Sequence, residues 1–284
     1  MEIFFTLLYA TLIGFYNIFK KCAVKKSSES TILVLFTTVS FLLSLMWLPF
    51  GMKIPAKFVL IFALKGFLLS FSWFIVLKVL KTADLSIVTV TNIISAVLSF
   101  ILGIVLFNET AGVWQIIGSV IIVLGVALIN LSNRNSKGQI TMLQLALLLV
   151  SALITTSSNV IDKYTTSHLS SFQVQFWFLL FVCLFSWIFY AIECIKNKKF
   201  LLQKSDFKNY WIYLVGIFLF IGDFMLFRAY AVPNSQMITI SILSKMKVII
   251  TVWLGTFIFK EKNILKKLLL SSLVIIGAIL ISVF

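Results

Sequence analysis

The sequence predicts an all-α membrane protein with ten transmembrane helices, arranged as two inverted five-helix repeats around a central cavity. Three observations support this fold class. First, hydrophobic residues make up 61% of the 284-residue chain and charged residues only 12%, whereas charged residues are roughly 25% of soluble proteins. Second, apolar stretches of about 20 residues, the length of a helix that crosses a bilayer, recur from end to end. Third, the two halves of the chain share matched residues in the same order.

The apolar stretches account for almost the whole chain. The loops between them are short, so we expect the protein to work within the bilayer and to have no soluble domain. In order, the predicted spans are residues 2–20, 30–50, 57–80, 84–107, 112–131, 141–162, 170–192, 209–230, 234–259 and 264–284.

Basic residues gather after the odd-numbered spans. A net charge of +15 would suggest a nucleic-acid partner in a soluble protein, but here its distribution indicates membrane topology instead. Loops rich in Lys and Arg stay in the cytoplasm, so we expect the odd-numbered loops to be cytoplasmic and both termini to lie outside. A second interpretation is that some of these lysines bind anionic lipid headgroups. The residues are Lys20, Lys21, Lys25, Lys26, Lys78, Lys81, Arg134, Lys137, Lys196, Lys198, Lys199, Lys204, Lys208, Lys260, Lys262, Lys266 and Lys267.

The two halves match at nearly constant offsets. The motif LFNE at 106–109 returns as IFKE at 258–261, 152 residues later, and Asn17 matches Asn159 at an offset of 142. Any one match is weak, but several in the same order indicate a duplication. The other matched pairs are Lys21 with Lys163, Gly103 with Gly255, and Gly125 with Gly277.

An odd number of spans in each half requires the halves to lie in opposite orientations. We therefore expect two repeats, residues 1–138 and 139–284. Inverted repeats are common in transporters, because two mirrored halves can open alternately to each side of a site between them. Membrane bundles also duplicate without transporting anything, so transport is the favoured interpretation of two.

The sequence resembles the drug/metabolite transporter superfamily, in particular its EamA-type ten-helix members. The resemblance covers essentially the whole chain. It is carried by NIFKK after GFY (14–21), by VLKTADLSIVTV (79–90), and by the paired endings FNET (107–110) and FKEK (259–262) before glycine-bearing helices. Unlike many family members, this chain has no proline in its fourth and ninth spans. The resemblance implies ten helices around a central cavity through which small organic solutes move.

Small and polar residues form one helical face in the fourth span and another in the ninth, at spacings of three and four residues. Two interpretations fit these stripes equally well: close helix packing, because small residues let backbones approach, or the wall of a polar cavity. The stripes are Thr89, Asn92, Ala96, Ser99 and Gly103, and Ser241, Ser244, Val248, Thr251 and Gly255.

The sixth span carries a longer polar face, which is unfavourable against lipid and should therefore point inward. We favour cavity lining over helix packing for it. Asn17 is its counterpart in the first half. Trp73 and Trp253 lie deeper than the interfacial belt where tryptophans usually gather, so each either packs or lines a cavity. The polar face consists of Ser151, Thr155, Ser158, Asn159 and Asp162.

Lys245 and Lys247 lie deep in the ninth span, where a charge costs about 2.5–3.5 kcal/mol by the lowest estimates. At about 100° per residue they point about 160° apart and flank the Ser244–Thr251 stripe. A lysine stem of about 6 Å does not easily reach the interface, so at least one lysine should face water or a negative partner. Lys247 is nearer the stripe and is the favoured solute-facing residue.

Asp223 is the natural partner for these lysines, since it is the acidic residue that lies well inside a span. A short link around Pro233 makes the eighth and ninth spans antiparallel, which puts Asp223 and Lys245 at comparable depth. Two interpretations follow: a buried Asp223–Lys245 pair that fixes helix register, or a proton or ligand site at Asp223. Separately, Glu109 and Glu261 each precede a span, and we expect each to stabilise a helix N-terminus.

The predicted function is secondary active or facilitative transport of a small organic metabolite by alternating access. Interior lysines favour an anionic or zwitterionic solute, such as an amino acid, organic acid or sugar phosphate. A proton is the coupling ion if Asp223 exchanges one. We expect no cofactor, metal or obligate protein partner. The predicted substrate-binding residues are Asn17, Trp73, Asn92, Asn159, Asp223, Ser244, Lys245, Lys247 and Thr251.

Two other functions compete with transport of a metabolite. A lipid flippase or a channel shares every feature above except the size of the solute. A membrane-embedded enzyme, such as a lipid-group transferase, needs clustered carboxylates or a nucleophile with a base, but the one histidine, His168, lies in a loop, so we do not expect an enzyme. Lysine far outnumbers arginine, which favours an AT-rich bacterial source and hence the plasma membrane.

Overall fold

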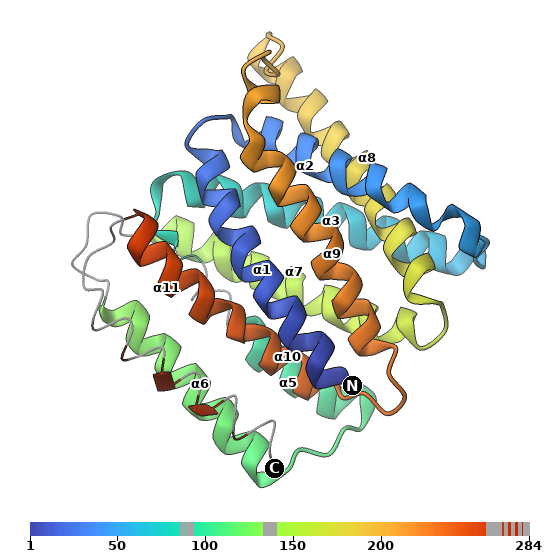
Figure 1. The fold of residues 1–284 in the computed structure, drawn as a ribbon, viewed down its shortest axis with the longest axis vertical. Coiled ribbons are helices and arrows are strands. Elements are labelled where there is room, and N and C mark those ends of the chain that lie inside the picture. Colours follow the sequence, from blue (N-terminus) through green and yellow to red (C-terminus); the bar gives the residue numbers. More distant parts are fainter. Residues whose placement is uncertain are drawn as a thin grey trace.

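The computed structural model is helical throughout the part of the chain that it describes, which is residues 1–85, 88, 94–132, 141–259, 269, 272, 273, 276, 277 and 280 (Figure 1). The helices are α1 (Glu2–Val24), α2 (Glu29–Ser44), α3 (Ala56–Thr82), α5 (Ile94–Phe107), α6 (Val113–Ser132), α7 (Met142–Thr166), α8 (Ser171–Asn197), α9 (Tyr210–Tyr230), α10 (Met237–Leu243) and α11 (Lys247–Phe259), with 3-10 turns η1 (Leu45–Phe50), η2 (Asp206–Lys208) and η3 (Ser244–Met246).

Within the described ranges, seven helical stretches are long and apolar enough to cross a membrane. They correspond to the predicted first, second, third, sixth, seventh, eighth and ninth spans, while α5 and α6 contribute shorter apolar helices at the fourth and fifth. The start of the predicted fourth span and most of the tenth lie outside the described residues. The protein is therefore an all-α, multi-pass membrane protein, and the exact count of ten helices stays a prediction.

Local capping explains where α7 and α8 begin. Thr141 accepts a hydrogen bond from the Gln144 amide while the Gln144 side chain accepts one from the Thr141 amide, and Ser170 and Gln173 repeat this capping box. Each box satisfies backbone donors that the first turn of a helix leaves unpaired. These polar residues flank the apolar stretches and fix the first turn of two spans.

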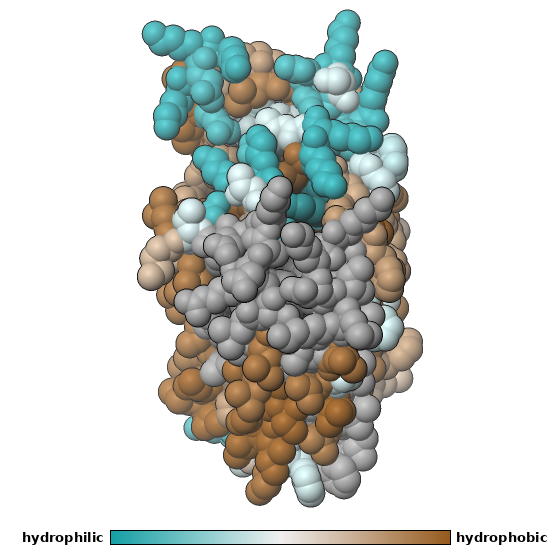
Figure 2. Space-filling view, turned by 90° about the vertical axis from the view of Figure 1, so that its left-hand side faces the viewer, coloured by the Kyte–Doolittle hydropathy of each residue, from teal (hydrophilic) through white to brown (hydrophobic). Residues whose placement is uncertain are grey.

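One end of the molecule carries the loops that follow α1, α3 and α8. The Lys81 ammonium, at the end of α3, lies 3.0 Å from the Glu29 carboxylate, and a surface cleft is shared by Lys26, Lys81 and Gln203. Figure 2 shows hydrophilic side chains gathered at this end above a hydrophobic surface. We call this end the basic face.

The even-numbered loops and the N-terminus meet at the other end, which we call the opposite face. Gln173, at the start of α8, donates hydrogen bonds to the carbonyl groups of Gly51 (3.0 Å) and Lys53 (3.1 Å). The Glu2 carboxylate accepts one from the Gln236 amide at 3.1 Å. The chain thus passes from one face to the other with each successive span described here, as a membrane-crossing chain must.

Matched lysines make matched contacts in the two halves. The Lys21 ammonium donates to the carbonyl of Ala83 at 2.7 Å, beyond the end of α3. The Lys163 ammonium donates to the carbonyl of Ser235, beyond the end of α9. Ala83 and Ser235 are themselves separated by the 152-residue offset of the sequence repeat. The repeat detected in sequence therefore also relates contacts in space.

The matched asparagines also make matched contacts, but each of these contacts joins one half to the other. Asn17 on α1 donates to Thr251 on α11 at 3.4 Å, and Asn159 on α7 donates to Ser99 on α5 at 3.1 Å. Ser99 and Thr251 are again 152 residues apart. The first helix of each half therefore contacts the fourth helix of the other half. The predicted repeat boundary at 138/139 falls outside the described residues and stays a prediction.

Close packing of α3 on α8 depends on Gly66. A Cβ added at this buried glycine would lie 2.6 Å from the Phe181 Cβ and 2.9 Å from the Phe181 carbonyl carbon, so the backbones themselves would have to separate. We expect Gly66→Ala to destabilise the fold by about 1–3 kcal/mol and to lower the melting temperature in detergent. Gly112→Ala is the matched control, because nothing lies within 4 Å of its added Cβ. Equal melting temperatures for the two variants would contradict this packing.

A candidate solute cavity between the two halves

A cavity of about 130 Å³ lies between the halves. Helices α1 and α3 of the first half line it, together with α7, α8, α9 and α11 of the second half. Sites for organic ligands are usually about 300–1,000 Å³. In this conformation the cavity therefore admits a metabolite only if its walls move apart.

The polar face of α7 lines this cavity along its length. Its five members, Ser151, Thr155, Ser158, Asn159 and Asp162, all contribute to the wall. Their spacing keeps them on one side of the helix, so this one helix supplies four uncharged polar side chains and one carboxylate to the wall. Asn17 on α1 and Trp73 on α3 complete this polar wall from the first half.

Five charged side chains line the cavity, namely Lys20, Lys65, Asp162, Asp223 and Lys247. Lysines thus outnumber carboxylates among the described lining residues. The Lys20 ammonium donates a hydrogen bond to the Tyr16 hydroxyl at 3.1 Å. Interior charges in a membrane protein typically mark a pathway or a binding site.

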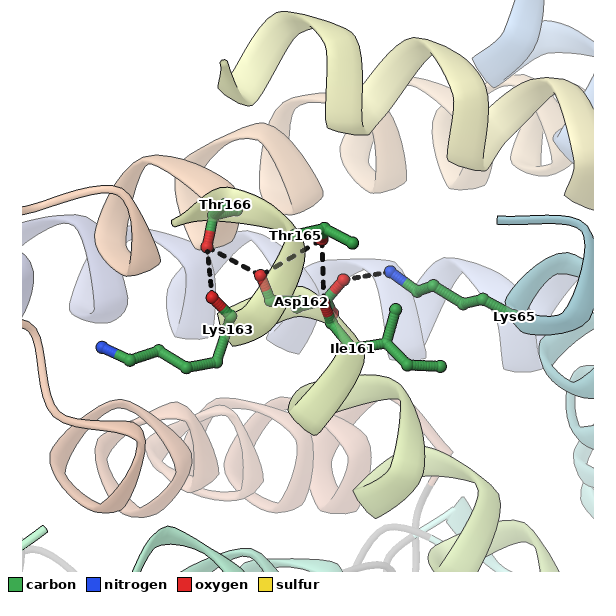
Figure 3. Close-up of polar contacts among 6 residues, drawn as sticks. All are labelled: Lys65, Ile161, Asp162, Lys163, Thr165 and Thr166. Atoms are coloured by element: carbon green, nitrogen blue, oxygen red, sulfur yellow. Dashed lines mark hydrogen bonds and ion pairs between the residues drawn. The ribbon is translucent and has the colours of Figure 1, made fainter. Parts of the chain in front are cut away.

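Lys65 and Asp162 form an ion pair across the cavity wall (Figure 3). Lys65 is 1% exposed and Asp162 3%. The Lys65 ammonium also lies over two rings, 4.0 Å from the centre of Phe178 and 5.0 Å from that of Phe227. Lys65 is absent from the predicted site residues. The sequence contained one sign that Lys65 is functional, because a charged residue inside an apolar span typically marks a site or pathway.

Lys247 and Asp223 differ from that pair. Within the residues that the structure describes, neither forms an ion pair, although both line the cavity. The Lys247 ammonium lies 5.3 Å from the ring centre of Tyr9. Two opposite charges are therefore present in the cavity without a salt-bridge partner in the described ranges.

The Asp223–Lys245 pair, one of the two interpretations of Asp223, is not present among the described residues. The Lys245 ammonium instead donates to the Ser95 hydroxyl on α5 at 2.7 Å, and Lys245 does not line the cavity. The physical reason is the break in the ninth span at η3. A 3-10 turn advances about 120° per residue against about 100° in an α-helix, so Lys245, the middle residue of η3, is turned by part of the roughly 60° that the three residues add together.

Ser244 and Thr251 are packed rather than exposed to the cavity. Ser244 donates to the Ser241 carbonyl at 2.7 Å, and Thr251 contacts α1 through Asn17. A Cβ at Gly14 would lie 2.7 Å from the Cβ of Ile250. At Thr251 the stripe therefore serves packing of α11 against α1, which is one of its two interpretations.

The predicted site residues divide into three groups. Asn17, Trp73, Asn159, Asp223 and Lys247 line the cavity, Ser244, Lys245 and Thr251 do not, and Asn92 lies outside the described residues. Lys20, Lys65, Tyr9 and Tyr16 also line it and were missed. Lys20 was grouped with the basic residues of the first loop because it is the last residue of the predicted first span, whereas α1 continues to Val24.

A group of contacts joins the halves at the opposite face. The Glu109 carboxylate accepts hydrogen bonds from the amides of Met237 (2.6 Å) and Ile238 (2.9 Å). Glu109 therefore stabilises a helix N-terminus, but that of α10 in the other half rather than that of α6, which follows it. The matched Glu261 lies outside the described residues.

Comparison with known proteins identifies a family and a related fold. The model of the EamA-like transporter family matches residues 1–131 and again residues 142–283. A solved structure, described only as a crystal structure of a protein, is similar over 96% of both chains, with a TM-score of 0.70 and 14% identity. At that identity the likeness concerns the fold alone. Comparison with curated proteins gives no match.

Proposed function

Because the chain belongs to the EamA-like transporter family, we propose that it carries a small anionic or zwitterionic organic metabolite across the membrane. The observation that carries this proposal is the pair of cavity charges, Lys247 and Asp223, that have no ion-pair partner among the described residues. Asp223 is buried and Lys247 is half-buried. A charge withdrawn from water without a partner is costly, and a charged solute would provide one. The excess of lysine over aspartate in the wall favours a solute with a carboxylate or phosphate. Amino acids, organic acids and sugar phosphates meet this requirement.

The proposed mechanism is alternating access between the two halves. The solute binds beside Lys247, near the middle of the ninth span, and the halves rock to open the cavity first to one face and then to the other. The matched hydrogen bonds of Asn17 and Asn159 support this mechanism. Each joins the first helix of one half to the fourth helix of the other half, so the two halves contact each other in equivalent ways. From the charge distribution we propose that the basic face is cytoplasmic, and from the excess of lysine over arginine that the membrane is a bacterial plasma membrane.

The proposal is tested by a thermal-shift screen on the purified protein. The ligands are carboxylates, phosphates, zwitterions, organic cations and lipids, each added to the protein in detergent. A ligand that binds the folded state raises the melting temperature, and we expect carboxylates, phosphates or zwitterions to do so. Stabilisation by organic cations alone would contradict the proposed substrate class, and stabilisation by lipids alone would favour a flippase.

Proton coupling is a further part of the proposal, with Asp223 as the proton site. We expect Asp223→Asn to abolish uptake driven by a pH gradient in proteoliposomes, because an amide cannot carry the proton. Exchange of solute across the membrane without a gradient should persist. Asp206→Asn is the control, since Asp206 lies at the basic face and accepts a hydrogen bond from the Gln203 amide at 2.8 Å. Unchanged gradient-driven uptake in Asp223→Asn would exclude this coupling route.

A further inference from the structure

We propose that the Lys65–Asp162 ion pair is opened by the solute itself, and that this exchange makes the transporter selective for zwitterions. The inference rests on the proposed function and deepens it. The solute carboxylate replaces Asp162 beside Lys65, while the solute ammonium replaces Lys65 beside Asp162. No covalent bond changes in this exchange.

The position of the pair supports this role. Lys65 belongs to α3 in the first half and Asp162 to α7 in the second, so the pair ties the two halves together through the cavity wall. Lys65 lies in the first half of α3 and Asp162 in the last two turns of α7, which places both toward the opposite face. Lys20, on α1, lies toward the basic face. The pair therefore lies toward one end of the cavity.

The energetics of buried charge explain why a zwitterion is required. Separating a buried pair leaves two charges without partners, which is strongly unfavourable. A simple anion satisfies Lys65 but leaves Asp162 unpaired, and a simple cation does the reverse. A zwitterion satisfies both at once. The Lys65 ammonium lies over the rings of both Phe178 and Phe227, so it keeps favourable cation–π contacts while its ionic partner changes.

The turn that carries Asp162 also reaches the opposite face. Lys163, the next residue, points away from Lys65 (Figure 3) and binds the carbonyl and hydroxyl of Ser235. Thr165 and Thr166 both donate to the Asp162 carbonyl, at 3.3 and 2.7 Å. One turn of α7 therefore contacts both Lys65 of α3, through Asp162, and Ser235, which precedes α10, through Lys163.

The test compares binding of α-amino acids with binding of their deaminated acids and decarboxylated amines, measured by thermal-shift titration. In the wild type we expect the amino acid to bind about 10-fold or more tightly than either analogue. In Lys65→Met/Asp162→Leu this discrimination should clearly fall, and what remains is due to the other charged groups of the cavity, Lys20, Asp223 and Lys247. The charge-swapped variant Lys65→Asp/Asp162→Lys should restore it. Melting temperatures without ligand establish that each variant is folded, and either double variant suffices for the test.

The contrary outcomes distinguish failure of this inference from failure of the proposed function. If the folded Lys65→Met/Asp162→Leu variant discriminates as the wild type does, or the folded charge-swapped variant does not discriminate, the pair is structural and this inference fails alone. It also fails alone if the wild type binds carboxylic acids as tightly as amino acids, since the proposed transport of anions would stand. If no anionic or zwitterionic probe binds the wild type, both the inference and the proposed function fail.

Discussion

Replacing Lys65 by methionine is expected to lower the free energy of unfolding by about 3–5 kcal/mol, because Asp162 then keeps a buried charge without its partner. Asp162→Leu should cost a similar amount for the complementary reason. The double variant Lys65→Met/Asp162→Leu should recover most of the loss, since it removes both charges together. Melting temperatures in detergent of the wild type and the three variants form the cycle that measures this coupling.

The control is the exposed pair at the basic face. Lys81→Met removes the partner of Glu29, but the Lys81 side chain is 51% exposed, so water replaces the lost contact and the cost should be about 0–1 kcal/mol. The account of the buried pair would be contradicted if Lys65→Met cost no more than Lys81→Met. It would also be contradicted if the double variant were as unstable as the sum of the two single variants.

The second large effect is expected on binding. Lys247→Met should weaken binding of an anionic or zwitterionic solute by about 2–5 kcal/mol, the usual cost of truncating one partner of a buried charge pair. That range corresponds to a loss of affinity of roughly 30-fold to several thousandfold. Folding should be retained, because the Lys247 ammonium contacts the Tyr9 ring and forms no ion pair within the described chain.

Lys78→Met is the matched variant for this prediction. The Lys78 ammonium also lies over an aromatic ring, 4.2 Å from the centre of Phe74, but Lys78 does not line the cavity. Its replacement should leave solute affinity unchanged. Thermal-shift titration with the same solute measures the affinity of both variants. Equal affinity for wild type and Lys247→Met would show that Lys247 is not part of the site.

Hydropathy and the internal match were enough to predict most of the scaffold. Long apolar stretches have one stable state in a bilayer, which is why the seven described spans follow the expected ranges closely. The matched pairs Asn17 with Asn159 and Lys21 with Lys163 were visible in sequence, because duplication preserves contacts as well as residues. Their spatial partners, such as Thr251, belong to other helices and were identified only in the structure.

The errors in the site share one physical origin. The Asp223–Lys245 pair was expected from depth along two antiparallel helices, and depth follows from residue number. Which way a side chain points depends on local winding, and η3 changes it before Lys247. Likewise, the partnership of Lys65 with Asp162 joins helices of different halves. No spacing along the chain encodes that neighbour, whereas the polar face of α7 was predictable from spacing alone.

The most direct test of the central proposal is counterflow in proteoliposomes. Vesicles containing the purified protein are loaded with an unlabelled solute that stabilises it, and uptake of the labelled solute is followed over time. We expect transient accumulation of label in wild-type vesicles and its loss in Lys247→Met vesicles. Uptake no faster than in protein-free vesicles, with accelerated lipid exchange between leaflets instead, would contradict metabolite transport through this cavity.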